Sequence, residues 1–220
     1  MGTYGQGKKD VLNCAKWLSE HGYFGGYRGS GGNISVRIND SNLIAITPSG
    51  KSYHEMLSDD ICVIDSDQKP VEGHLIPSVE TSMHLGIYQH RPNMGAIIHT
   101  HPVFASVLSI INQPIPALFD EIAFEIGTSV EIVPYAISGS SELVQNVVGK
   151  LDNHCFCYII QNHGALSLGK DINQAWKNAE LLEKVAQVYY YALTTGRKIT
   201  TLPKDAVAQI NKLRGQRPPA

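Results

Sequence analysis

Two histidines, His99 and His101, stand two residues apart at the end of an apolar run that begins at Ala96. The run is β-branched and predicts a buried strand, on which residues two apart point to the same side. Pro102 then ends the strand and suits the first turn of a helix. Neutral imidazole is a favoured ligand of zinc and related ions, so the pair indicates a divalent-metal site at the end of this strand.

A third histidine, His163, is expected in the same kind of position. It follows the short apolar run 155–160, and Gly164 directly after it permits a tight turn. Three histidines with an open fourth position are typical of a catalytic zinc site rather than a structural one. The alternative is three unrelated structural histidines, and the shared position at strand ends favours the metal site.

Glu80 lies near the start of a helix expected over 78–90, upstream of the histidine pair. It is a candidate general acid/base beside the metal, or an additional ligand when substrate is absent. The alternative is a first-turn carboxylate that the helix dipole stabilises, and the residue alone favours that explanation. His84 follows one turn later on the same helix face and is expected to support Glu80 or to pack.

Three short polar segments are candidates for binding an anion. The glycine-rich loop 29–33 could surround a phosphate with backbone N–H groups, and the loop 47–50 is of the same kind. Ser78 is expected at a helix N-terminus, where anions also bind. Each segment alone is more often a plain turn. The glycines precede a strand and no Gly-Lys-Ser/Thr ending follows, so neither a dinucleotide fingerprint nor a Walker loop is present.

Composition narrows the class of protein. The 220 residues suffice for one large or two small domains, and 43% hydrophobic with 17% charged residues is typical of a globular chain. A net charge of −2 without a basic stripe argues against nucleic acid or a membrane surface as partner. The sequence contains no transmembrane-length apolar run and no signal-peptide core. The four cysteines form no metal motif or disulfide framework, so we expect a cytoplasmic protein.

The elements that must position these residues alternate along the chain. Strands are expected over 33–38, 43–47, 61–65, 130–134 and in the runs that end at the histidines. Helices are expected over 9–21, 78–90, 103–111, 141–151 and 172–195. The first two strands read as a hairpin across 39–42. We therefore predict one α/β domain with a mixed or antiparallel sheet covered by helices.

Five motifs follow one another in a fixed order: Gly-Ser-Gly-Gly-Asn-Ile-Ser, Thr-Pro-Ser-Gly, Pro-Ser-x-Glu, His-x-His and Asn-His-Gly. Together they resemble the class II aldolase/adducin family over about residues 10–195. The resemblance implies a single-domain α/β/α layered fold around a central, mainly antiparallel sheet. It also implies a cyclic homotetramer with a metal site near each subunit interface. We therefore expect the chain to consist of an N-terminal tail over 1–9, one domain over 10–202 and a C-terminal tail over 203–220.

The resemblance also implies roles for single residues. It makes His99, His101 and His163 the ligands of Zn²⁺, with manganese or another divalent ion as the alternative to zinc. Glu80 becomes the residue that removes and returns a proton, and an additional metal ligand. The implied phosphate-binding set is Asn33, Ser49, Gly50 and Ser78, with Ser30 and Gly32 lining the same loop.

Three departures from the aldolase pattern bear on the reaction. Val79 stands where sugar-phosphate aldolases usually have a second serine, and no tyrosine follows Leu202 in the tail. Asp120 stands where an aldolase of the family has a tyrosine. An acidic residue in this segment is a feature shared with the epimerases of the family, which use it as an acid/base. Unlike this chain, however, the epimerases carry Asp at the position of Glu80. Asp120 is therefore a second candidate catalytic residue.

The expected function is that of a metal-dependent aldolase, a carbon–carbon lyase. It would reversibly cleave a small ketose phosphate to dihydroxyacetone phosphate and an aldehyde through an enediolate, which a Lewis-acidic ion stabilises. Loss of carbon dioxide or proton removal reaches the same oxyanion, so a decarboxylase or epimerase of a related sugar acid or sugar phosphate is the alternative. A non-catalytic, adducin-like interaction module is the alternative of another class, and it has no physical need for three converging imidazoles.

Aromatic residues in segments that look exposed are consistent with the implied tetramer. Three consecutive tyrosines, 189–191, run around the last predicted helix and cannot all face one core. Phe119, Phe124 and Ile126 lie in a stretch without a predicted element and would expose an apolar patch. A subunit interface would cover them. The alternative is that they cover the sheet of their own subunit.

Overall fold

The computed structural model describes residues 4–25, 31–38 and 42–216, and within them nine strands form one sheet. The strand order is β4-β3-β2-β1-β5-β9-β8-β7-β6. Every neighbouring pair is antiparallel except β7 and β8, which are parallel. The strands are β1 (Asn33–Arg37), β2 (Ile44–Ile46), β3 (Cys62–Ile64), β4 (Pro70–Glu72), β5 (Ala96–Thr100), β6 (Ile115–Pro116), β7 (Ser129–Val133), β8 (Cys157–Ile160) and β9 (Gly164–Gly169).

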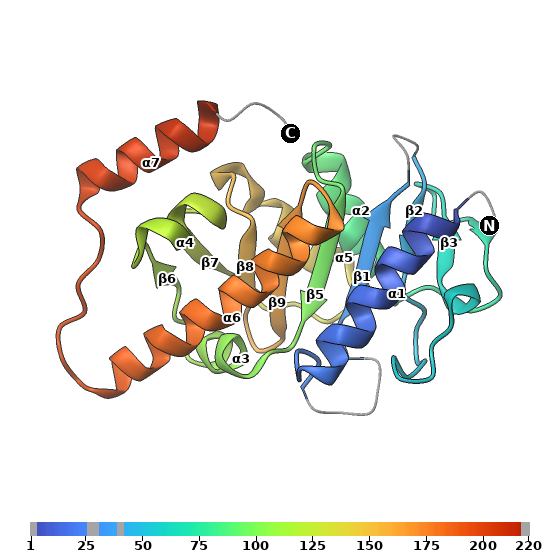
Figure 1. Ribbon diagram of the computed structural model, residues 1–220, viewed down its shortest axis with the longest axis horizontal. Coiled ribbons are helices and arrows are strands. Elements are labelled where there is room, and N and C mark those ends of the chain that lie inside the picture. The colour runs from blue at the N-terminus through green and yellow to red at the C-terminus, as the bar shows by residue number, and fades with distance from the viewer. Residues whose placement is uncertain (1–3, 26–30, 39–41, 217–220) are drawn as a thin grey trace.

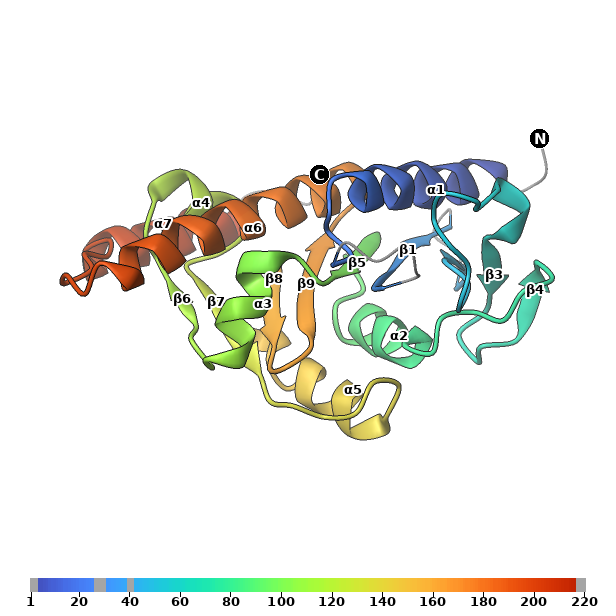
Figure 2. The ribbon, with the colours of Figure 1, turned by 90° about the horizontal axis from the view of Figure 1, so that it is seen from below.

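Helices cover both faces of this sheet (Figures 1 and 2). They are α1 (Gly5–Glu20), α2 (Thr81–His90), α3 (Val103–Ile110), α4 (Asp120–Glu125), α5 (Ser141–Val148), α6 (Ile172–Thr194) and α7 (Lys204–Gln216), with short 3₁₀ turns at Ser58–Asp60 and Leu151–Asn153. Figure 2 shows α1 and α6 along one face and α2 with α5 along the other. The fold is thus a single-domain α/β/α sandwich with a mainly antiparallel sheet, which confirms the predicted fold class.

The central strand β5 is buried along its whole length. Ala96 and Ile98 pack in the core beneath α1 and α6, whereas Ile97 packs in the core beneath α2 and α5. Alternate residues of a strand face opposite sides, so His99 lies on the same side as Ile97. The strand therefore carries the first candidate ligand toward α2.

The predicted elements are present, with shifted ends. Helix α6 begins at Ile172 as expected and ends one residue earlier. Helix α1 begins at Gly5, inside the expected N-terminal tail, and its Lys8 is buried with Nζ 2.6 Å from Glu72 Oε1 on β4. The hairpin turn expected across 39–42 lies, except for Asn42, outside the described residues.

Five elements escape the sequence prediction: β4, β6, β9, α4 and α7. Three of them are short, and β9 has a glycine at each end, which is uncommon in strands. The expected C-terminal tail 203–220 holds α7, whose Ile210 is buried and whose Asn211 Oδ1 accepts a hydrogen bond from Thr128 Oγ1 at 3.1 Å. Among the described residues, no helix has both the length and the apolar character to cross a membrane.

Candidate active site

Strands β5 and β9 bring the three predicted ligands together. His99 is the fourth residue of β5, His101 follows that strand, and His163 precedes β9, its antiparallel neighbour. His99 Nε2 lies 3.0 Å from His101 Nε2 and 3.3 Å from His163 Nε2. Zinc–nitrogen bonds of about 2.0–2.1 Å in a tetrahedron separate two ligand nitrogens by about 3.3–3.4 Å. The imidazoles therefore fit a divalent ion.

The protonation of the imidazoles suits the same role. His99 Nδ1 lies 3.0 Å from the Ala165 carbonyl oxygen, to which it must donate, so Nε2 keeps its lone pair for a metal. Burial, and then the neighbouring histidines, hold the pKa of His99 well below its ordinary value. Burial also lowers the pKa of His101. Both rings are neutral near pH 7 and require no proton loss before they bind a cation.

Two glycines allow the backbone to pass close to these rings. A Cβ added at Gly164 would lie 2.5 Å from both His101 Cδ2 and the Thr100 carbonyl oxygen. Gly32 has a φ of +70°, and a Cβ there would collide with the His99 carbonyl oxygen. Tyr53 Oη donates a hydrogen bond to the Gly32 carbonyl oxygen at 2.8 Å. Gly32 therefore packs directly behind β5, beside the ligand set.

Glu80 faces the three imidazoles from the residue before α2. Its side chain is buried, with Oε2 3.2 Å from His99 Nε2 and Oε1 3.4 Å from His163 Nε2. Asn33, the register partner of His99 on β1, donates a hydrogen bond from Nδ2 to Oε2 at 2.8 Å. Among the residues that the structure describes, Oε1 has no hydrogen-bond partner. A buried acceptor without a donor is suited to a cation or to a proton delivered by a ligand.

Two of the predicted phosphate-binding residues, Asn33 and Ser78, contact Glu80 directly. The loop 47–50 runs against the segment before α2: Ser78 N donates to the Thr47 carbonyl oxygen at 3.1 Å, and Ser49 N donates to the Ile76 carbonyl oxygen at 2.8 Å. Ser49 and Gly50 are exposed, and Ser78 Oγ accepts from Glu80 N at 3.3 Å. Asn33 is buried and bound to Glu80, and Ser30 lies outside the described residues.

Asp120 is not near this group within one subunit. It is exposed in the first turn of α4, which follows the edge strand β6. Strands β7 and β8 separate β6 from β9 in the sheet. Any role for Asp120 at the histidine site therefore requires the site of a neighbouring subunit.

The aromatic segments proposed for an interface divide into two groups. Ile126 is 0% exposed and Tyr189 is 5% exposed, because both pack in the core formed by α3, α4 and α6. The expectation that Ile126 belongs to an exposed apolar patch is wrong, whereas a buried Tyr189 and an exposed Tyr191 agree with the expectation that the three tyrosines do not all face one core. Phe119 and Tyr191 are 45% and 55% exposed and remain candidates for a subunit contact.

Two further polar groups near the site escaped the sequence prediction. Ser138 Oγ, in the turn before α5, lies 3.3 Å from His163 Nε2. Turns rich in serine and glycine are common in proteins, so the composition of this turn does not indicate that Ser138 contacts His163. Behind Glu80, Ser35 Oγ lies 2.7 Å from His84 Nδ1. Its position two residues after Asn33 on the same face of β1 is the one indication that the sequence contains.

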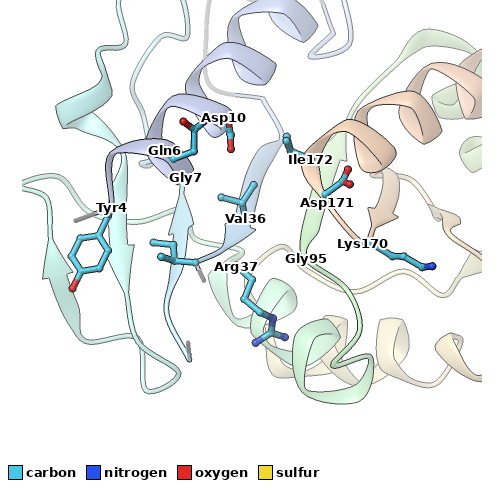
Figure 3. A pocket seen from close by; sticks show the side chains of 11 residues that line it. Tyr4, Gln6, Gly7, Asp10, Val36, Arg37, Gly95, Lys170, Asp171 and Ile172 are labelled. Atoms are coloured by element: carbon cyan, nitrogen blue, oxygen red, sulfur yellow. Dashed lines mark hydrogen bonds between the residues drawn. The ribbon is translucent and has the colours of Figure 1, made fainter. Parts of the chain in front are cut away.

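A pocket of about 200 Å³ lies at the opposite end of β1 (Figure 3). Figure 3 shows Arg37 and Asp10 on one side of it and Lys170 and Asp171 on the other. Gly95, before β5, also lines this pocket, whereas Asn33 and His99 lie at the far ends of their strands. The pocket is thus separate from the histidine site.

The chain is similar to several named proteins and to a solved structure. A protein from Methanococcus maripaludis named L-fuculose phosphate aldolase is 38% identical over 162 residues, which are 74% of this chain and 86% of that protein. A protein from Bacillus thuringiensis named 5-deoxy-D-ribulose 1-phosphate aldolase is 33% identical over 186 residues, 84% of this chain and 85% of that one. A solved structure of an L-fuculose 1-phosphate aldolase matches with a TM-score of 0.85 and 32% identity, covering 94% of this chain and 95% of that chain.

The model of the class II aldolase and adducin N-terminal domain matches residues 9–190. The match includes all three converging histidines, Glu80 and the loops beside it. Proteins of the aldolase branch use a divalent metal, and the three imidazoles of this chain form a group able to hold one. The chain belongs to the class II aldolase and adducin N-terminal domain family.

Proposed function

We propose that this protein is a divalent-metal-dependent aldolase that reversibly cleaves a small ketose phosphate to dihydroxyacetone phosphate and an aldehyde. The observation that carries the proposal is the position of Glu80. Its buried carboxylate faces three converging imidazoles, and its Oε1, which lies 3.4 Å from His163 Nε2, has no hydrogen-bond partner among the described residues. A scaffold protein would have no use for this arrangement. The names of the relatives support the same class of substrate.

His99, His101 and His163 would hold the metal, and Glu80 would add a ligand oxygen when substrate is absent. When bound, a divalent ion acts as a Lewis acid that polarises the substrate carbonyl and stabilises an enediolate. Zinc is the ion that the three-histidine set favours, with manganese or another divalent ion as the alternative. We further propose a cytoplasmic enzyme of carbohydrate metabolism that works as a homotetramer, as the family resemblance implies.

The chain's own residues would bind the substrate and move its proton. The backbone N–H groups of Gly32 and Gly50, with the hydroxyl groups of Ser49 and Ser78, are suited to the phosphate. That anchor puts the carbon skeleton between the loops and the imidazoles. Glu80 Oε1 would then take the proton from the carbon next to the carbonyl and return it in the reverse direction. Asn33, bound to Oε2, keeps the carboxylate turned toward that carbon.

Replacing Glu80 with Gln tests this proposal. Glu80→Gln should keep the metal but lower the exchange of the dihydroxyacetone phosphate C–H with solvent by about 100-fold or more, the usual contribution of a general base. Proton exchange followed by NMR in deuterated water measures this. Exchange at the wild-type rate would exclude Glu80 as the base. Chelation should abolish turnover and a divalent ion should restore it, whereas turnover indifferent to chelators would refute the metal dependence.

One observation favours a second candidate, a decarboxylase or epimerase of a related sugar acid or sugar phosphate. Val79, between Ser78 and Glu80, is 66% exposed and gives the proposed anion site no hydroxyl group. A substrate panel assayed for aldehyde, carbon dioxide and isomer formation separates these reactions. The non-catalytic alternative predicts a protein that binds no stoichiometric metal even after reconstitution.

A further inference from the structure

Strand β1 and the segment of helix α2 run side by side in the same direction, and polar side chains of the strand form hydrogen bonds with polar side chains of the helix segment. Alternate residues of β1, beginning at Asn33, face the helix, and every fourth residue of the helix segment, beginning at Glu80, faces the strand. Two strand residues advance about 6.6 Å and four helical residues about 6.0 Å. These repeats nearly match, so polar groups from the two elements alternate in one buried row.

The row links five side chains in sequence, and each link is short. Asn33 Nδ2 lies 2.8 Å from Glu80 Oε2, and Asn33 Oδ1 lies 2.6 Å from His84 Nε2. Ser35 Oγ lies 2.7 Å from His84 Nδ1 and 3.0 Å from Tyr88 Oη. All five residues are buried, so no water competes for these contacts.

The chemistry of the groups sets the direction of the hydrogen bonds from Glu80 to Ser35. A carboxylate only accepts, so Asn33 must turn its NH₂ group to Glu80 and its oxygen to His84. His84 Nε2 must then carry the proton and donate it to that oxygen. Burial lowers the pKa of His84 to about 3, so the ring is neutral and Nδ1 accepts from the Ser35 hydroxyl group. The Tyr88 hydroxyl group has one proton for two acceptors, Ser35 Oγ at 3.0 Å and the Ser35 carbonyl oxygen at 3.2 Å.

We propose that His84 is a positioning residue for Glu80, and this inference rests on the proposed function. By donating from Nε2, His84 holds the Asn33 amide in the one orientation that binds Glu80 Oε2. That bond leaves Oε1 as the oxygen that faces the substrate. Without His84, the amide can rotate and the carboxylate can turn toward either imidazole, since His99 and His163 lie 3.2 and 3.4 Å away.

Two substitutions at one position separate positioning from packing. His84→Leu removes both nitrogens but keeps the site filled, whereas His84→Gln keeps an N–H donor for Asn33. We expect His84→Leu to lower kcat and the rate of dihydroxyacetone phosphate proton exchange about 10- to 100-fold, the effect of a misplaced catalytic group. KM should change less than about twofold, and His84→Gln should recover most of the rate.

A double substitution tests whether His84 acts through Asn33. Because both residues serve one hydrogen bond, Asn33→Ala with His84→Leu should be no slower than Asn33→Ala alone. Additive losses would overturn the proposal, as would a Gln variant as slow as the Leu variant. Thermal unfolding and metal content are measured for each variant. A rate loss that only follows the folded or metal-loaded fraction would also refute positioning.

The tautomer of His84 can be measured without any turnover. This test depends neither on the proposed reaction nor on whether the His84→Leu variant folds. NMR of metal-free, ¹⁵N-histidine-labelled protein should show His84 with its proton on Nε2 and slow exchange of that proton with water. Asn33→Ala should make this exchange fast. A proton on Nδ1, or no change in Asn33→Ala, would overturn the inference. A wild-type protein that has this tautomer but neither cleaves ketose phosphates nor exchanges dihydroxyacetone phosphate protons would instead refute the proposed function.

Discussion

The close approach of Gly164 to the metal-binding imidazoles gives a sharp prediction for a single methyl group. A Cβ at this position would lie 2.5 Å from His101 Cδ2 and from the Thr100 carbonyl oxygen, and 3.1 Å from His99 Cε1. Ordinary contact begins at 3.4 Å, so Gly164→Ala must displace a ring or the backbone by about 0.9 Å. Metal–ligand distances tolerate only about 0.2 Å. We therefore expect about 10- to 100-fold weaker metal binding, the size of effect that follows loss of a ligand's supporting contact.

Competition with a chromophoric chelator measures this affinity, and metal content after dialysis checks it. Gly7→Ala is the matched control, because a Cβ there meets side chains only at 3.4 Å, in the first turns of α1. It should leave metal affinity unchanged and stabilise the protein by about 0.5–1 kcal/mol through helix propensity. A Gly164→Ala variant that binds metal as tightly as wild type would refute the argument that this backbone approach shapes the ligand set.

Three further predictions concern the rest of the chain. Glu183 accepts hydrogen bonds from Phe104 N and Ala105 N at the start of α3, and burial raises its pKa above the ordinary 4.5, so the folded state holds this proton more tightly than the unfolded state. As pH rises from below 4.5 through the pKa of Glu183 in the folded state, wild type should therefore lose stability relative to Glu183→Gln. Denaturant unfolding at a series of pH values measures this, and the absence of such a trend would contradict the prediction. Light scattering should give the mass of four chains, and a fully active species of 24.1 kDa would exclude the tetramer and any shared site. If Asp120 acts across an interface, Asp120→Asn should be slow and mixed oligomers with Glu80→Gln should regain activity, whereas a fully active Asp120→Asn variant would remove this residue from the mechanism.

The ligand set is predictable from sequence because its geometry is local. His99 and His101 are two residues apart on one strand, and the alternation of a strand is enough to put both rings on one side. His163 required one more step, the recognition that another apolar run ends just before it. That Glu80 joins them depends on the family resemblance, since its position near a helix start has an adequate structural explanation of its own.

What the sequence does not reveal depends on register between elements distant in the chain. Asn33 meets Glu80 because β1 pairs with β5 so that Asn33 lies opposite His99, and no local pattern selects that register over its neighbours. The expectation for Ile126 is wrong for a related reason: α4, which ends just before it, has six residues, too few to show a helical period, so this segment could not be distinguished from a loop. The row from Glu80 to Tyr88 combines both cases. Its spacings of four on the helix and two on the strand are visible in the sequence, but their meaning appears only when the two elements lie side by side.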